Sequence, residues 1–302
     1  MGSQYINLSE VENRMGHLIP EKISAAVADT LIKASVSFRE DQVKAYTVAL
    51  EKEKNDKAKW VINNILTNAK IGEKEQLPLC DDTGIPHIFI EAGDQAELPA
   101  GFFAAVDEGV KKGLRLLPGR PMAVKGNDIQ RICQSEGLYD DSGMLISAPF
   151  QIRRMPGNDV KLTVLMYGGG PEIRGKTQRV FHKHSLTTVK DEMIEWATEG
   201  AKLLGCLPCV LAFGIGRSNV EAASLSLEAM KDGNFDYQTQ LESEITYEVN
   251  KSNIGPLGLG GKTTVLGTFI KVGPQRASGV RIISLRIGCC FDPRKAMYTW
   301  SF

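Results

Sequence analysis

The sequence predicts a mixed α/β fold, in which a helical N-terminal region is followed by alternating helices and strands. Three observations lead to this expectation. Apolar residues recur at three- and four-residue spacing across residues 8–70, as in amphipathic helices. From residue 85 onward, short strand-like segments alternate with helical ones, and glycine-rich loops separate them. No linker or low-complexity tract divides the chain, so residues 1–302 are expected to form one domain that includes the helical region 1–70.

The helical region is predicted from its start and from its periodicity. Ser9, followed by acidic residues at positions 10 and 12, suits a helix N-terminus. Residues 23–38 and 57–71 carry the apolar pattern of helices, and the polar run EKEKNDK (51–57) between them is expected to be solvated.

The later elements follow from shorter patterns. A turn is expected at Pro156 and Gly157, and Gly205 suits a helix C-terminus. The predicted strands are 85–93, 148–155, 159–170, 208–216, 263–272 and 279–290, and the predicted helices are 99–117, 186–205, 219–233 and 236–252.

Composition narrows the class of protein. Lys+Arg and Asp+Glu are equal at 36 each, so the chain has no basic excess with which to hold a nucleic-acid backbone. No apolar run reaches membrane-spanning length, and the N-terminus lacks the apolar stretch of a secretion signal. We therefore expect a cytoplasmic protein that binds neither nucleic acid nor membrane. In that compartment its six cysteines are expected to be thiols or metal ligands rather than disulfides.

Three glycine clusters stand beside predicted strands, at 167–172, 213–219 and 253–264. Each could be a simple tight turn, because glycine readily adopts positive φ. Such loops also expose backbone N–H groups that can hold an anion. The end of the third cluster, GLGGKTT, resembles a phosphate-binding P-loop, but the required first glycine falls on Pro256 and no buried strand precedes it. A nucleotide-triphosphatase is therefore not expected.

The cysteines allow several kinds of site. Cys133 has no special surroundings and is expected to be a buried core thiol. Cys206 and Cys209 form a single CxxC, which is weak support for zinc or for a redox pair. One thiolate from this pair, one from the adjacent Cys289 and Cys290, and Cys80 would together suit an iron–sulfur cluster that leaves one iron open. The spacing alone does not choose among these possibilities.

Five motifs stand out in combination. They are Cys80-Asp81-Asp82-Thr83-Gly84, Cys206-Leu207-Pro208, Gly214-Ile215-Gly216, the loop 255–264, and Cys290 with Arg294. Over residues 10–297 the chain resembles the alpha subunit of the iron–sulfur hydro-lyases, a family that includes class I fumarate hydratase and L(+)-tartrate dehydratase. The family's corresponding motifs are Cys-Gln-Asp-Thr-Gly, Cys-Pro-Pro, Gly-Ile-Gly, a Gly-Pro-rich loop and a final Cys-x-x-x-Arg.

The resemblance implies a [4Fe–4S] cluster held by Cys80, Cys206 and Cys290, which makes Cys209 and Cys289 neighbours of ligands. It implies a small carboxylic-acid substrate and a separate beta subunit, together with an alpha–alpha dimer within a heterotetramer, because the chain stops shortly after the third cysteine motif. The implied catalytic residues are Asp82, Thr83 and Lys262. The implied substrate-binding residues are Asp81, Arg120, Gly168, Gly169, Gly170, Thr263 and Thr264.

Two positions depart from the family pattern. Asp81 replaces a glutamine, and Ser278 stands where the family has a histidine, twelve residues before the third cysteine. His182 and His184 could replace that imidazole in space, or they could be a solvated loop pair. Both departures bear on which hydroxy-acid is used, and a non-catalytic or regulatory relative that binds a cluster or zinc is the alternative to an enzyme.

Overall fold

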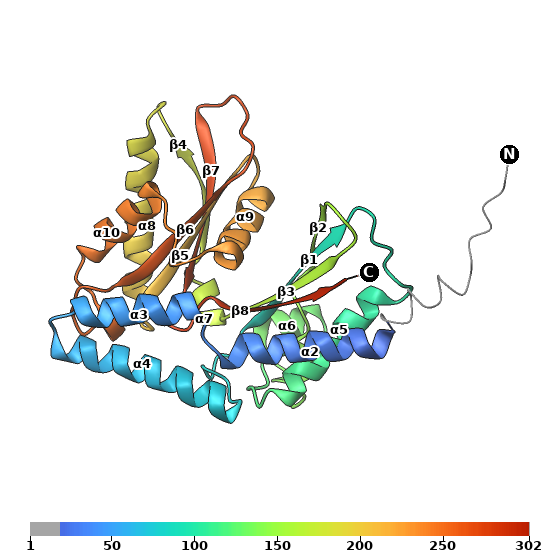
Figure 1. Ribbon diagram of the computed structural model, residues 1–302. Helices are drawn as coiled ribbons and strands as arrows, with labels where there is room; N and C mark the ends of the chain where they lie inside the picture. Colours follow the sequence, from blue (N-terminus) through green and yellow to red (C-terminus); the bar gives the residue numbers. More distant parts are fainter. Residues whose placement is uncertain (1–18, 302) are drawn as a thin grey trace. The chain divides into compact units, whose positions relative to one another are not determined.

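The computed structural model describes residues 19–301 and contains two compact units (Figure 1). In the described part of the chain, unit 1 comprises residues 19–35, 85–166 and 295–301, and unit 2 comprises residues 36–84 and 167–294. Each unit is assembled from segments far apart in the sequence. Composition does not change at these boundaries, which is why the sequence by itself predicts a single domain.

Unit 1 combines one sheet with helices. Its strand order is β2-β1-β3-β8, and β1 and β2 run parallel with Phe89 opposite Gln151. The helices α2 and α5 approach closely because Gly109 leaves room for Val27, which a Cβ at that position would meet at 2.6 Å. The elements are α2 (Pro20–Val36), β1 (Ile85–Gly93), α5 (Phe102–Leu116), α6 (Asp128–Cys133), η1 (Ser142–Leu145), β2 (Gln151–Met155), β3 (Val160–Tyr167) and β8 (Arg294–Trp300).

Unit 2 is built around a second sheet with the order β4-β7-β5-β6. Every residue of β5 is buried, and β5 runs parallel to β6 and antiparallel to β7. This explains the uninterrupted apolar run in its sequence, since a strand covered on both faces needs no polar side. The strands are β4 (Lys176–Phe181), β5 (Cys209–Gly216), β6 (Val265–Val272) and β7 (Val280–Gly288).

Helices cover both faces of this sheet (Figure 1). The helix α9 (Asn219–Asp232) packs so closely on β5 that a Cβ at Gly214 would lie 2.1 Å from the Ala222 carbonyl oxygen. On the other face, α8 (Leu186–Leu204) and α10 (Gln240–Asn250) form the main core with the alternate residues of β5. Trp196 and Phe213 are among its buried side chains.

Unit 2 also contains two neighbouring helices, α3 (Glu40–Lys52) and α4 (Asp56–Glu75), which run in opposite directions (Figure 1). Asn55 begins α4 by accepting the N–H groups of Lys57 and Ala58 with its side chain. Tyr46 and Ile62 of this pair pack in one apolar cluster with Cys290. Two short helices, α7 (Gly169–Glu172) and η2 (Pro256–Gly258), lie in the first and third glycine clusters.

The sequence predictions for the fold are largely confirmed. The helical region and the strands and helices predicted after it are present, and Gly205 follows α8 with a φ of +79°. The predicted start at Ser9 lies outside the described residues. The sequence missed α6, β4 and β8. The run 51–57 was expected to be solvated, yet Glu53 within it is only 3% exposed. None of the helices in residues 19–301 has both the length and the apolar character needed to cross a membrane.

Candidate metal centre

The first and last cysteine motifs are joined by a buried arginine. Arg294 is 1% exposed, and its Nη1 donates to the carbonyl oxygens of Asp82 at 2.8 Å and Thr83 at 3.1 Å. Its Nε donates to the fully buried carboxylate of Asp292 at 3.3 Å. The guanidinium therefore fixes the turn that follows Cys80 against the turn that follows Cys290.

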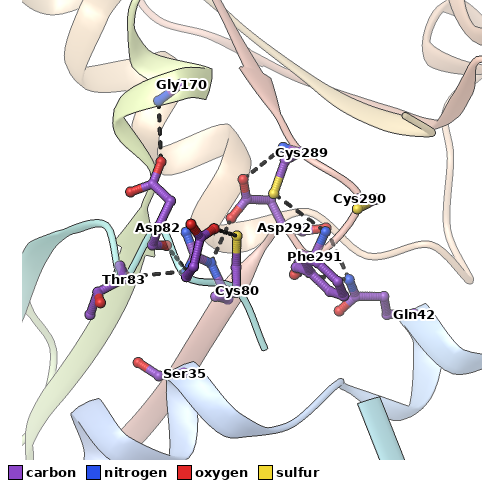
Figure 2. A network of polar contacts seen from close by, with 12 residues as sticks. Ser35, Gln42, Cys80, Asp82, Thr83, Gly170, Cys289, Cys290, Phe291 and Asp292 are labelled. Carbon is purple, nitrogen blue, oxygen red and sulfur yellow. Dashed lines mark hydrogen bonds and ion pairs between the residues drawn. The ribbon is translucent and has the colours of Figure 1, made fainter. Parts of the chain in front are cut away.

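The first glycine cluster closes on the same turn. The Gly170 N–H donates to Oδ2 of Asp82 at 3.2 Å (Figure 2). A Cβ at Gly168 would lie 2.7 Å from that oxygen, so only glycine leaves room for the carboxylate. Thr83 is 2% exposed and Asp82 is half-buried. The structure thus brings the predicted site residues Asp82 and Thr83 to the predicted anion-binding glycines 168–170.

The second and third cysteine motifs meet through their backbones. The Cys290 N–H donates to the carbonyl oxygen of Cys206 at 3.0 Å. The Leu257 N–H donates to the carbonyl oxygen of Leu207 at 3.2 Å, which places the third glycine cluster beside the CxxC. Because Arg294 ties the Cys80 turn to the Cys290 turn, all three predicted ligands belong to one connected region of unit 2.

The thiol of Cys289 lies among the other cysteines. In Figure 2 its sulfur is drawn between those of Cys80 and Cys290. The Cys289 thiol is hydrogen-bonded to Cys290, and its charge acts on both Cys80 and Cys206. Cys290 packs against the apolar cluster around Tyr46. The adjacent Cys289 and Cys290 therefore both place a sulfur in this region. Only the resemblance to the family motif selects Cys290 as the third predicted ligand.

Two of the three predicted ligand thiols, those of Cys80 and Cys206, have raised pKa values that favour the protonated form. Burial, with a further contribution from the Cys289 charge, raises the pKa of Cys80 to about 12. The same two causes raise the pKa of Cys206. A thiolate is the form that binds metal, so metal binding here must release protons. The positive charge of Arg294 acts in the opposite direction. It favours the thiolate of Cys80, but burial outweighs it.

The helix α3 supports the turn after Cys290 from one side. Gln42 Nε2 donates to the carbonyl oxygens of Phe291 at 3.3 Å and Asp292 at 3.0 Å. The Tyr46 hydroxyl donates to the carbonyl oxygen of Cys290 at 2.5 Å. Burial raises the pKa of Tyr46 well above its ordinary value, so this hydroxyl keeps its proton and remains a donor.

The end of α3 holds the third glycine cluster. Glu53 accepts the Lys262 N–H at 2.7 Å and the Lys54 N–H at 2.8 Å. A Cβ at Gly261 would lie 2.9 Å from the Glu53 carboxylate. A residue with a side chain at this position would therefore prevent the loop from approaching Glu53 so closely. Thr264 is fully buried, and its hydroxyl accepts the Gly255 N–H at 3.1 Å. That hydroxyl therefore holds the loop together.

The remaining predicted residues, all of them within residues 19–301, have different surroundings, and only Asp81 among them contacts a cysteine of this region. Lys262 and Thr263 line a pocket that contains none of the six cysteines. Arg120 is exposed in unit 1, with its Nη2 at 3.9 Å from the Met122 sulfur. Asp81 is exposed, and the Cys80 thiol lies 3.7 Å from its Oδ1. Cys133 was expected to be buried, but it is exposed on the short helix α6.

The predicted solvated histidine pair is confirmed for His184, which is exposed, and is wrong for His182, which is buried. His182 is 7% exposed, its Nε2 lies 2.7 Å from the Ser278 carbonyl oxygen, and its Nδ1 accepts the His184 N–H at 2.9 Å. His182 thus lies beside Ser278, but both its nitrogens are engaged in holding the loop. Ser278 precedes the nine-residue strand β7 and Cys289 follows it, so about 27 Å of strand separates the two ends. Neither histidine replaces an imidazole at the cysteines of the same chain.

The third glycine cluster is not a P-loop. A P-loop connects a buried strand to a helix. Here the helix α10 precedes the loop and the strand β6 follows it, which is the reverse order.

The donor set can be compared with what a single ion and a cluster each require. Among residues 19–301, no three His, Cys, Asp or Glu side chains converge closely enough to hold one metal ion. In a cluster each thiolate binds a different iron, so the sulfurs need not converge on one point. The buried Nη2 of Arg294 has no hydrogen-bond partner among the described residues, and it is a donor suited to an anionic group of thiolates and sulfides.

Sequence reasoning missed the residues that support this region. Gln42 and Tyr46 lie in a helix whose pattern indicates only an amphipathic surface, and Glu53 directly follows that helix. The one feature of the sequence that could have indicated this role is a polar residue on the apolar face of the helix. Gln42 is such a residue, and it is 1% exposed. Arg294 was quoted as part of a motif, but its contacts with the first motif could not be read from the sequence.

Comparison with known proteins gives consistent matches over most of the chain. Residues 24–298 match the model of the family described as fumarate hydratase (Fumerase). A protein of Methanocaldococcus jannaschii named putative L(+)-tartrate dehydratase subunit alpha is 28% identical over 283 residues, covering 90% of this chain and 94% of the relative. The L(+)-tartrate dehydratase subunit alpha of Escherichia coli strain UTI89 is 23% identical over 277 residues, covering 89% of this chain and 88% of the relative.

Proposed function

Because this chain belongs to the fumarate hydratase family, we propose that it is the alpha-type subunit of a hydro-lyase that adds water to, or removes it from, a small hydroxy-carboxylic acid. The observation that carries the proposal is the connected region formed by Arg294, Asp82 and Gly170. It joins two cysteine motifs to a glycine loop, the predicted anion-binding loop, within one unit.

The proposed cofactor is a [4Fe–4S] cluster bound by Cys80, Cys206 and Cys290. Three thiolates leave one iron without a protein ligand, and such an iron can act as a Lewis acid toward a substrate hydroxyl and carboxylate. The support for this ligand set is the backbone bond between Cys206 and Cys290 and the arginine that links the Cys80 and Cys290 turns.

The chain's own residues would bind and orient the acid. The N–H groups of the glycine loop 168–170 can donate hydrogen bonds to a substrate carboxylate beside Asp82, as glycine-rich loops do for other anions. Asp82 and Thr83 are the proposed catalytic residues, because they follow Cys80 directly and are fixed by Arg294. Arg120 is proposed to grip a second carboxylate, since a guanidinium offers two parallel donors. The assignment of Lys262 to catalysis and those of Thr263 and Thr264 to substrate binding remain predictions.

A partner subunit is part of the proposal. The relatives in Methanocaldococcus jannaschii and Escherichia coli are named as alpha subunits, and we propose that this chain likewise pairs with a beta subunit. The base that removes the proton from the neighbouring carbon is assigned to that subunit. We also propose that two alpha-type chains associate in the assembled enzyme.

The substrate is fumarate or malate, tartrate, or a substituted analogue. Asp81 adds a carboxylate where the family has a glutamine, so an acid with an extra hydroxyl or amino group has a local acceptor to pair with. The test is co-expression with a beta-type subunit of the family, anaerobic purification, iron counting, and assay with malate, tartrate and amino- or methyl-substituted analogues. Iron bound to the purified protein, together with turnover of one of these acids, is expected. Bound cluster without turnover of any acid would favour a non-catalytic relative instead.

A further inference from the structure

A second polar site lies at the other end of α3. A pocket of about 830 Å³ opens between the end of α3, α10 and the third glycine cluster. Four lysines line it, Lys52, Lys54, Lys251 and Lys262, and we call it the lysine pocket. Glu51 is its only acidic lining residue, so the pocket has an excess of three positive charges, four minus one.

Three of these lysines are available to a ligand. Among residues 19–301, no acidic side chain forms an ion pair with Lys52, Lys54 or Lys262. The fourth, Lys251, is paired with Glu248 at 2.7 Å and lies over the Tyr247 ring at 4.7 Å. Like charges gathered without counter-charges repel one another, and an anion between them relieves that repulsion.

The lysines are also held in place by their backbones. The buried carboxylate of Glu53 accepts the N–H groups of Lys54 and Lys262, which are 208 residues apart, and so fixes two walls of the pocket to each other. Asn250 fixes the third wall, because its Oδ1 accepts the N–H groups of Thr264 and Val265, both at 2.8 Å. The pocket is therefore preorganised, although its charged side-chain ends are exposed.

We propose that the lysine pocket binds a phosphorylated small molecule of nucleotide size. Its volume falls within the range of small-molecule sites and is generous for a four-carbon acid. Lysine ammonium groups bind phosphate as point charges. The hydroxyl groups of Ser243, Thr246 and Tyr247 also line the pocket and supply uncharged hydrogen-bonding groups. This mode uses side chains, unlike a P-loop.

The pocket is separate from the cysteine region but connected to it by α3. Gln42 contacts the turn after Cys290, and Glu53, eleven residues later, contacts the loop that carries Lys262. A rise of 1.5 Å per residue places these contacts about 16 Å apart along the helix. A ligand in the lysine pocket would therefore act as an effector rather than as the substrate.

The test is calorimetric titration of the full chain with magnesium-free ATP, inorganic pyrophosphate and citrate at two salt concentrations. The double variant K52Q/K54Q is compared with K70Q/K202Q, which removes two exposed lysines that do not line the pocket. We expect saturable binding of ATP or pyrophosphate that weakens with salt and at least about tenfold in K52Q/K54Q, with no change in K70Q/K202Q. Circular dichroism and thermal unfolding without ligand confirm that both variants fold.

Four results would overturn the proposal. Three of them are no binding of either phosphate compound, tighter binding of citrate than of ATP and pyrophosphate, and equal effects of the two double variants. A fourth is that K52Q/K54Q abolishes association with the beta-type subunit while leaving phosphate binding unchanged, because the pocket would then be a subunit contact. The titration measures binding and does not require turnover. Its result therefore tests the lysine pocket even if the hydro-lyase assay detects no activity.

Discussion

Arg294 holds the backbone of Asp82 across 212 residues of sequence, through a hydrogen bond of 2.8 Å from its Nη1 to the Asp82 carbonyl oxygen. The same side chain pairs with Asp292, which is fully buried. Removing the guanidinium would leave a buried carboxylate without its partner charge. We expect R294A to lose roughly 3–5 kcal/mol of unfolding free energy, measured by urea denaturation, and to lose bound iron. R179A, which removes an exposed arginine, is the control and should change neither.

The cysteine assignments can be tested one thiol at a time. Replacing Cys80, Cys206 or Cys290 by serine should reduce the iron content of anaerobically purified protein severely. Replacing Cys133 or Cys289 should leave it near the wild-type value, and C209S should keep iron if it folds. The decisive pair is C289S and C290S, because the Cys289 thiol acts on both Cys80 and Cys206. Iron loss in C289S with retention in C290S would assign the third ligand to Cys289.

Asp81 is expected to set substrate preference. Its carboxylate stands where the family has a neutral amide, next to the proposed ligand Cys80. In the complex with the beta-type subunit, D81Q should raise kcat/KM for malate relative to hydroxy- and amino-substituted analogues, because one negative charge near an anionic substrate is removed. Iron content should stay unchanged. Efficient malate turnover by the unmodified complex, with no change in D81Q, would contradict this role.

Glu53 should make stability depend on pH. Burial opposes its charge, but the N–H groups of Asn55, Lys262 and Lys54 outweigh it and lower the pKa of the carboxyl group. A lowered pKa in the folded state gives stability that is present above the unfolded pKa, near 4.3, and is lost as the pH falls through the folded pKa. E53Q should therefore unfold more easily than wild type at pH 7, by about 1–3 kcal/mol, and this difference should shrink below about pH 4.

The control for this prediction is E51Q, two residues earlier and exposed. It should show little change at either pH. A stability difference for E53Q that is constant from pH 7 to pH 3 would show that shape, and not charge, accounts for the effect.

Gly84 ends the first cysteine motif in a conformation and a space that exclude other residues. Its φ is +87°, and an added Cβ would lie 2.9 Å from the carbonyl carbon of Tyr167 and 3.0 Å from Nη2 of Arg294. G84A should cost at least about 2 kcal/mol and reduce iron content, since backbone must move. G205A is the matched control, because Gly205 has a φ of +79° with open space around its Cβ position. It should cost only the strain of its backbone, about 1 kcal/mol.

Periodicity predicted most of the elements, because each amphipathic helix or buried strand carries its own local pattern. The strand β4 was missed because three of its six residues face solvent as polar or charged side chains and a glycine cluster precedes it. The strand β8 was missed because it starts at Arg294, whose burial depends on a partner 212 residues away.

The candidate site was predictable only where chemistry and motif coincide. Cys80, Asp82 and the glycines 168–170 were predicted and lie together. Glu53 could not be identified from the sequence, because a glutamate within EKEKNDK resembles any solvated residue. Its role depends on the third glycine cluster, whose Lys262 N–H donates to its carboxylate. The relation of His182 to Ser278 was equally hidden, since it depends on the antiparallel register of β4 and β7.

The contact between Arg294 and Asp82 also orders events during biosynthesis. The Cys80 turn leaves the ribosome more than two hundred residues before the arginine that fixes it. Throughout that interval its thiol belongs to an open segment, and the residues of unit 1 between 85 and 166 are made before unit 2 can close. The proposed metal loading would therefore follow synthesis of residue 294, because until then the Cys80 turn lacks the arginine that fixes it.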